Sequence, residues 1–167
     1  MRAGLIAALT LAAASLAHPG HTHSMPNSTV IIDASRPGRI GLTVTIPISE
    51  LEAAAPGWNA TGRAGLEAFV HEHVRVRGSD QRDWIGTLTK VARPGGDHPQ
   101  LRLFLRFTPA KGAAQTAGQL RYDAVIDRIA SHYVLVYRRE DGRLRPLSRL
   151  QPPDTTVDLA ADLRPNP

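Results

Sequence analysis

The clearest pattern along this chain is an alternation of apolar and polar residues, which is typical of strands with one buried face. Apolar residues occupy every second position over 40–46 and again over 101–107. Weaker versions of the pattern predict further strands over 30–32, 84–91, 120–126 and 133–137. Turn signals rich in proline and glycine separate these segments, at 36–38 and at 94–97. We therefore expect a chain dominated by short strands.

One stretch departs from the alternation and has the spacing of helices. Residues 49–52 form a capping-box pattern, and the short helix that they open should end before the following proline and glycine. A second helix should run from 61 to about 74, because Leu66 and Val70 fall on one face. We expect both helices to form one insertion, around 49–74, between an early hairpin and the remaining strands.

Short strands separated by turns favour a mainly β fold, with an antiparallel, immunoglobulin-like β-sandwich as the expected architecture. Residues 28–163 would form one domain, which suits the ~150 residues that follow a leader. Residues 157–163 are expected to form a last edge strand, and residues 164–167 a tail. The chain has no cysteine, so neither a disulfide nor a thiolate metal site can form.

Residues 1–17 have the organisation of a cleavable export signal. Arg2 supplies the positive start, an apolar run follows, and Ser15-Leu16-Ala17 offers the small residues that a signal peptidase accepts. Cleavage after Ala17 would make His18 the new N-terminus. The run is shorter than the ~20 apolar residues needed to span a bilayer, and charges interrupt every later candidate. We expect a periplasmic or secreted protein with no transmembrane helix in its mature chain.

The chain is basic, with a net charge of +5 and a pI near 10.4. Nearly all of its positive residues are arginines, since Lys90 and Lys111 are the only lysines, and they are scattered through strand-like segments. No basic stripe with interleaved aromatics is visible, which argues against a nucleic-acid partner. We expect a solvated, arginine-rich surface, with weak attraction to anionic lipid headgroups as a secondary effect.

The candidate chemistry lies in a His-rich segment, residues 18–27. His18, His21, His23 and Met25 bring four metal-ligand side chains together, and imidazole and thioether suit copper, nickel or zinc. As an N-terminal residue, His18 could chelate through its amine and its imidazole, and a third nitrogen would complete a copper-binding brace. The alternative is a tail that takes up metal weakly and without a defined geometry.

His71-Glu72-His73 is the nearest internal approach to a metal motif. In a helix, residues two apart point to nearly opposite sides, whereas in a strand they share a face. Because the surrounding pattern favours a helix, we expect His71 at the surface and His73 partly packed. The sequence contains no nucleophile elbow, phosphate-binding glycine loop or zinc-protease helix, so no complete catalytic constellation is visible.

A series of short motifs adds a resemblance to a known family. In order, they are His23-Ser24-Met25-Pro26-Asn27-Ser28, Val30-Ile31-Ile32-Asp33, Leu51-Glu52, Leu103-Phe104-Leu105-Arg106-Phe107-Thr108-Pro109, Leu120-Arg121-Tyr122-Asp123 and Ser131-His132-Tyr133-Val134-Leu135-Val136. Together they resemble the extracytoplasmic N-terminal domain of HupE/UreJ-like membrane proteins, over most of residues 25–137. The resemblance implies nickel handling and a membrane-protein partner of the HupE/UreJ type.

The positions that match this family's motifs and could bind metal are His23, Met25 and His132. In a sandwich, the first strand and the strand that follows His132 could lie side by side, which would bring His23 and His132 together. The alternative for His132 is a buried imidazole that hydrogen-bonds to backbone at the start of a strand. The transmembrane helices of the family have no counterpart in this sequence, so we expect the domain itself to transport nothing.

Three functions are compatible with these features. The first is an exported, non-catalytic accessory domain that binds nickel or copper through His18, His21, His23, Met25 and His132 and acts with a membrane partner. The second is a metal-independent protein-interaction module of the cell envelope. The third is a copper enzyme with a histidine brace, which the aromatic content of 5% disfavours because such an enzyme needs a flat aromatic substrate face.

Overall fold

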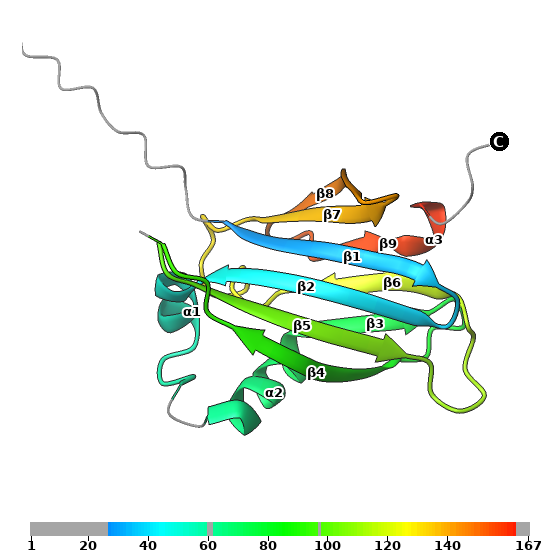
Figure 1. Ribbon diagram of the computed structural model, residues 1–167, viewed down its shortest axis with the longest axis horizontal. Helices are drawn as coiled ribbons and strands as arrows, with labels where there is room; N and C mark the ends of the chain where they lie inside the picture. The colour runs from blue at the N-terminus through cyan, green and yellow to red at the C-terminus, as the bar shows by residue number, and fades with distance from the viewer. Residues whose placement is uncertain (1–26, 60–61, 97, 163–167) are drawn as a thin grey trace, which may run out of the picture.

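The computed structural model describes residues 27–59, 62–96 and 98–162, and within them the chain forms nine strands and three helices (Figure 1). In chain order the elements are β1 (Ser28–Arg36), β2 (Arg39–Pro47), α1 (Ile48–Ala54), α2 (Gly62–His73), β3 (Val74–Gly78), β4 (Ile85–Ala92), β5 (Gln100–Thr108), β6 (Ala117–Tyr122), β7 (Val134–Glu140), β8 (Arg143–Leu150), β9 (Thr156–Asp158) and α3 (Leu159–Asp162). The predicted mainly β fold is confirmed. The predicted helical insertion is confirmed as well, because α1 and α2 follow the β1–β2 hairpin directly.

Six strands form the larger sheet, in the order β4-β5-β2-β1-β7-β8. The β1–β2 hairpin turns at Pro37-Gly38, and Gly38 has a φ of 66°, a left-handed conformation that glycine adopts at little steric cost. Neighbouring strands are antiparallel except for β1 and β7, which run parallel with Ser28 beside Val134. The predicted antiparallel pairing is therefore right for every pair of this sheet but one.

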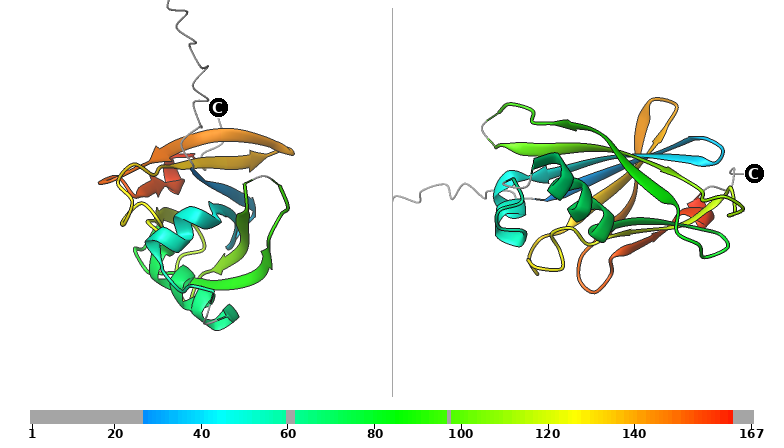
Figure 2. Two further views of the ribbon diagram at one scale, coloured as in Figure 1. Left: turned by 90° about the vertical axis from the view of Figure 1, so that its left-hand side faces the viewer. Right: turned by 90° about the horizontal axis from the view of Figure 1, so that it is seen from below.

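Three antiparallel strands form the smaller sheet, β3-β6-β9, which lies behind the larger one in Figure 1. The arrangement is sandwich-like, with an apolar core between the sheets, and an immunoglobulin-like strand order stays a prediction. Helix α2 packs against both β3 and β4, so it closes one side between the sheets (Figure 2). The largest fully buried apolar side chains include Ile32, Ile46, Leu51, Leu101, Leu103, Leu120, Tyr122, Ile126 and Leu150. Burial of one such side chain contributes about 1.5–3 kcal/mol to stability.

Two predicted strands end in other structure. The strand predicted over 120–126 ends at Tyr122, and the apolar residues that follow are buried in a turn whose Ile129 N–H donates to the Val125 carbonyl at 3.0 Å. The edge strand predicted over 157–163 shortens to β9, and α3 begins after it. Asp158 causes this change, because its carboxylate accepts the Ala160 N–H at 2.8 Å as a helix cap does.

Two strands of the structure are absent from the sequence-based prediction. Strand β3 begins at Val74, where the predicted helix ends, and no element is predicted from the sequence over residues 75–78. Strand β8 contains Pro146, and proline is disfavoured inside strands because it has no N–H to donate. The structure places Pro146 in an edge strand beside a register shift, where the missing N–H is tolerated.

The larger sheet has one side turned away from the core, and Figures 1 and 2 show no described helix lying across it. We call this side the outer face. Its half-buried positions on β1, β2, β5 and β7 include Thr29, Ile31, Asp33, Gly41, Thr43, Thr45, Phe104, Leu135 and Tyr137. None of the described helices is long and apolar enough to cross a membrane.

Candidate functional site

The predicted metal ligands fall in two places. His18, His21, His23 and Met25 lie outside the described residues, so their role as ligands stays a prediction. His132 is described, and it lies just before β7. In the part of the chain that the structure describes, no three or more His, Asp or Glu side chains form a group that could hold a metal ion.

The imidazole of His132 is buried at the end of the larger sheet where β1 begins. Its Nε2 atom accepts a hydrogen bond from the backbone N–H of Ser28 at 3.1 Å and lies 2.9 Å from the Ser28 hydroxyl oxygen. Because Nε2 accepts an N–H, the neutral ring carries its proton on Nδ1. Oε2 of Glu50 lies 3.5 Å from Nδ1, which is beyond normal hydrogen-bond length.

This environment affects both the charge and the availability of the ring. Burial lowers the pKa of His132, and the nearby Glu50 carboxylate opposes that shift. Ser28 engages the Nε2 lone pair, so a metal ion at this nitrogen would have to displace the Ser28 N–H. The geometry agrees with the alternative role, a buried imidazole bound to backbone at the start of a strand, while metal binding by His132 stays a prediction.

The strand arrangement predicted around His132 is confirmed. Strands β1 and β7 lie side by side and run parallel, so both begin at the same end of the sheet as His132. His23, the other half of the predicted pair, lies outside the described residues.

Glu50, His132 and Ser28 are the residue types of a nucleophilic triad, and the sequence did not reveal this cluster. They come from α1, a turn and β1, so no local motif links them. Ser28 is 0% exposed, and its hydroxyl cannot reach a substrate unless β1 moves. Tyr122 is equally buried: burial raises the pKa of its phenol strongly, the Ser28 side chain opposes this rise and the Asp123 charge adds to it. The cluster therefore holds the start of β1 in the interior.

The internal histidine pair behaves as the helical pattern predicts. His71 is exposed, whereas the His73 ring packs against Phe69 with ring centroids 4.6 Å apart. Nδ1 of His73 lies 2.9 Å from Oδ1 of Asp123, and Arg121 donates to the other carboxylate oxygen. His71 and His73 do not converge on one point, and the His73–Asp123 contact joins the end of α2 to the end of β6.

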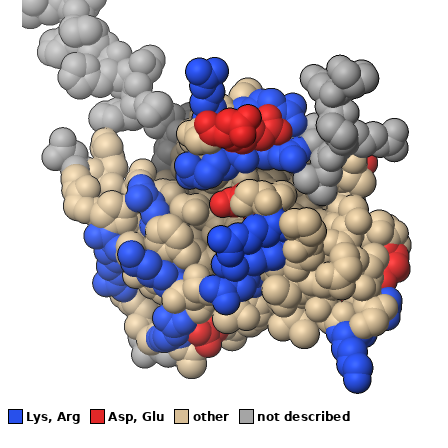
Figure 3. Space-filling view, turned by 45° about the vertical axis from the view of Figure 1, so that its right-hand side comes forward, with Lys and Arg blue, Asp and Glu red and all other residues tan. Residues whose placement is uncertain are grey.

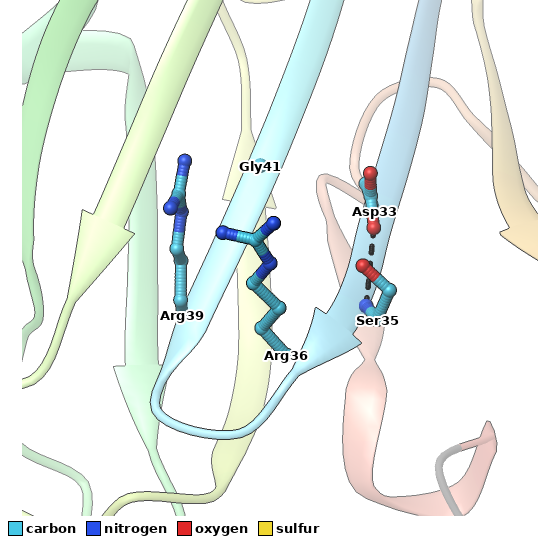
Figure 4. A pocket seen from close by; sticks show the side chains of 5 residues that line it. All are labelled: Asp33, Ser35, Arg36, Arg39 and Gly41. Atoms are coloured by element: carbon cyan, nitrogen blue, oxygen red, sulfur yellow. Dashed lines mark hydrogen bonds between the residues drawn. The ribbon is translucent and has the colours of Figure 1, made fainter.

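The outer face contains a polar hollow at the turn end of the β1–β2 hairpin (Figure 4). It has a volume of about 210 Å³ and is lined by Asp33, Ser35, Arg36, Arg39 and Gly41. A second hollow of about 180 Å³ adjoins it and shares Asp33, Arg39 and Gly41. Its other lining residues include Ile31, Leu42, Phe104, Arg106 and Arg139. We call the two together the arginine hollow.

Strand register brings these residues together. Arg106 on β5 pairs with Gly41 on β2, and Gly41 pairs with Asp33 on β1. Because Gly41 has no side chain, the surface dips between its two neighbours. Arg139 enters from β7, on the far side of β1. Thr89 adds β4, so the hollow draws residues from five adjacent strands.

The charges of the arginine hollow are unbalanced. Four arginines and one aspartate give it a formal charge of +3. Among the described residues, no carboxylate oxygen lies within 4.0 Å of a guanidinium nitrogen of these arginines. Asp33 instead accepts the backbone N–H of Ser35 at 3.0 Å. Hydrogen bonds from Ser35, and then the charges of Arg139 and Arg36, hold the pKa of Asp33 below its ordinary value.

An apolar row runs beside the hollow. The register aligns Phe104, Thr43, Ile31 and Tyr137 across four strands. The ammonium group of Lys90 lies 5.5 Å from the centre of the Phe104 ring, which adds a cation–π contact at one end of the row. Figure 3 shows Lys and Arg side chains gathered over this part of the surface. The outer face therefore combines apolar side chains with a surplus of positive charge.

The sequence predicts scattered arginines, whereas the strand order brings four of them together in the arginine hollow. One usable signal was Gly41, because a glycine inside a strand often marks a close approach or a gap in the surface. Alternation alone places Gly41 and Arg106 on outward positions. It does not say which strands are neighbours, and only the strand order joins them.

No family model matches this chain, and no curated protein sequence matches it significantly.

Proposed function

We propose that this chain is a non-catalytic binding domain that works outside the cytoplasm and docks an acidic, partly apolar segment of a membrane-protein partner on its outer face. The observation that carries the proposal is the outer face, which no described helix covers and where the apolar row and the arginine hollow adjoin. Aromatic residues and arginine together are typical of the energetically important parts of protein interfaces.

Charge determines the chemistry of the partner. The formal charge of +3 in the arginine hollow calls for an anionic group, and the planar guanidinium binds carboxylates through two parallel hydrogen bonds. In a partner segment with an acidic side chain flanked by apolar ones, the acidic group would bind in the arginine hollow and the apolar side chains would pack on the apolar row. Complementary charge would also speed association and reject basic partners.

The location and the class of partner rest on the sequence. The leader-like residues 1–17 support export, and the HupE/UreJ resemblance supports a membrane protein as the partner. The buried position of Ser28 supports a non-catalytic role, because the one triad-like cluster of the described residues has no exposed nucleophile.

Site-specific photo-cross-linking in the native host tests the docking proposal. A photoreactive amino acid at Thr43, inside the outer face, should give a discrete adduct with a membrane protein. The same group at Arg75, an exposed residue of β3 in the other sheet, serves as the control and should give no such adduct. Arg106→Glu together with Arg139→Glu should reduce the Thr43 adduct at least tenfold.

Two results would contradict docking. Equal adducts from Thr43 and Arg75 would mean that the outer face is not the interface. Binding of the wild type to protein-free phosphatidylglycerol vesicles that the double arginine variant loses, with no protein adduct in cells, would point to a lipid surface.

Metal binding is the second candidate function, and the parallel pairing of β1 with β7 favours it. This pairing brings the chain that enters β1 next to His132. Five residue steps separate His23 from Ser28, so their Cα atoms lie within about 18 Å of each other by chain length alone. Chain length therefore allows His23 to reach the end of the sheet where His132 lies.

Isothermal titration with nickel and with copper tests the metal proposal on a protein that begins at His18. Submicromolar, one-to-one binding that is lost in the His23→Ala/His132→Ala double variant would support a folded site. The single variants and a circular-dichroism spectrum of each protein control for loss of fold. Weak, multi-ion binding that the variants do not change would contradict it.

A further inference from the structure

We propose that the arginine hollow is a carboxylate-binding site that takes a carboxylate attached to a short apolar chain. This inference rests on the proposed function, since it names the chemical group that anchors the partner on the outer face. The composition and the shape of the hollow support it.

The donors come from both sides of one hairpin turn. Arg36 ends β1 and Arg39 begins β2, and the two residues pair across the hairpin. Figure 4 shows both side chains extending along the hairpin on the side of Gly41. Arg106 and Arg139 line the adjoining hollow from the two flanking strands. Guanidinium groups approaching from several directions suit an anion with two acceptor oxygens.

No carboxylate of the described residues forms an ion pair with the arginines of this site. Asp33 is the acidic residue of the hollow, and its Oδ1 atom accepts the Ser35 N–H at 3.0 Å. Ser35 thus supplies hydrogen bonds to the Asp33 carboxylate from within β1, while the arginine donors face the hollow. An external carboxylate would gain charge-assisted hydrogen bonds without first breaking an internal ion pair within 4.0 Å.

The apolar side of the site selects among carboxylates. Ile31 and Phe104 line the adjoining hollow next to Arg39 and Gly41, and both lie on the outer face. A chain of several methylene groups bound at the arginines would lie over these side chains. Each methylene that becomes buried should tighten binding by about fourfold. Hexanoate should therefore bind more tightly than acetate, and inorganic phosphate should gain nothing from the apolar side.

Gly41 offers a variant that fills the hollow without removing any charge. A Cβ atom at Gly41 would lie 3.6 Å from Cβ of Asp33, which is ordinary van der Waals contact. The backbone there is not left-handed, so a larger residue fits the strand. Gly41→Val should occupy the dip between Arg106 and Asp33. Loss of binding in this variant would then reflect shape, because all four arginines remain.

The test is a titration of the full mature chain with sodium acetate, sodium hexanoate and inorganic phosphate at constant ionic strength, followed by NMR. We expect hexanoate to shift the amide signals of Ser35–Gly41 and Arg106 and to bind at least tenfold more tightly than acetate. Gly41→Val and Arg39→Gln should each weaken hexanoate binding at least tenfold. Arg75→Gln removes the same charge from the other sheet and should change it less than twofold.

Three results would overturn the site. Equal affinity for acetate and hexanoate would mean that the apolar side chains do not contribute to binding. Tighter binding of phosphate than of hexanoate would mean that the hollow does not prefer carboxylates. Equal weakening by Arg39→Gln and Arg75→Gln would mean that net charge alone attracts the anion.

The two proposals fail separately. If the Thr43 adduct forms and is unchanged in the Gly41→Val variant, the docking proposal is supported, but the carboxylate site does not anchor the partner. If hexanoate binds in the hollow but Thr43 gives no adduct, the site stands and docking of a membrane partner is wrong.

Discussion

The two ends of β1 carry polar clusters of opposite kinds. At its start, Ser28 meets His132 and Glu50 inside the protein, and the Ser28 N–H bonds to the imidazole. Near its end, Asp33 and Arg36 lie in an open hollow with further arginines. One strand therefore joins a polar cluster that faces inward to one that faces water.

The comparison shows how to separate structural polar groups from binding groups. Buried polar atoms cost free energy unless they are hydrogen-bonded, so the Ser28–His132 contact is expected to maintain the fold. Exposed arginines without a close carboxylate cost little, since water solvates them, and they keep their donors for a ligand. Removing the first cluster should change stability, and removing the second should change binding.

The largest expected effect is that of His132→Ala. The variant removes a buried side chain and leaves the Ser28 hydroxyl without its partner, so the free energy of unfolding should fall by about 2–4 kcal/mol. Urea denaturation measures this change. His71→Ala removes an exposed imidazole and should change stability by less than about 0.5 kcal/mol. Similar small changes in both variants would contradict a structural role for His132.

The next effect is a pH dependence of stability that His132 causes. Its pKa in the folded protein lies below the ordinary 6.5, so as pH falls below that value the unfolded chain binds a proton that the folded chain does not. Stability should therefore decrease with falling pH between 6.5 and the lower folded pKa, by at most about 1.4 kcal/mol per pH unit. Urea unfolding at several pH values in the wild type and in His132→Gln measures it. An equal slope in both proteins would refute the assignment to His132.

A smaller effect, of opposite sign, is expected for Gly41→Val. Valine suits a strand better than glycine does, so stability should stay the same or rise by up to about 1 kcal/mol, while hexanoate binding is lost. Thermal unfolding and the NMR titration give the two quantities. A clear loss of stability would mean that the dip at Gly41 serves packing.

The smallest effect on stability should come from the arginines themselves. Arg39→Gln should change the free energy of unfolding by less than about 0.5 kcal/mol, because the side chain has no carboxylate within 4.0 Å among the described residues. Urea denaturation beside Arg75→Gln measures this difference. A loss above 1 kcal/mol in Arg39→Gln alone would give the arginine hollow a structural role.

The sequence predicted the parts of the fold that local patterns encode. Alternation located β2 and β5, and the 49–52 segment located α1. The predicted capping box is wrong, because α1 begins directly after Pro47 and has no side-chain hydrogen bond at its N-cap. The prediction is wrong where buried residues lie outside a strand. Ala124 and Ile126 continue the alternation of β6, but they are buried in a turn. It also failed at β8, because Pro146 is compatible with a strand only at a sheet edge.

The candidate sites were harder to predict because their residues meet only through the strand order. The parallel β1–β7 pair joins segments separated by most of the chain, and Ser28 and His132 are 104 positions apart. The residues of the arginine hollow come from β4, β5, β2, β1 and β7, which are neighbours in the sheet and not all in the sequence. The alternation identified outward positions, but the sheet order decided which of them share a surface.

The most direct test of the account compares photo-cross-linking from Thr43 and from Arg75 in the native host, in the wild type and in the Arg106→Glu/Arg139→Glu variant. The account predicts one membrane-protein adduct from Thr43, at least tenfold weaker in the variant, and none from Arg75. Equal adducts from both positions, or a Thr43 adduct that the variant leaves unchanged, would contradict the claim that the outer face is a charge-selective docking surface.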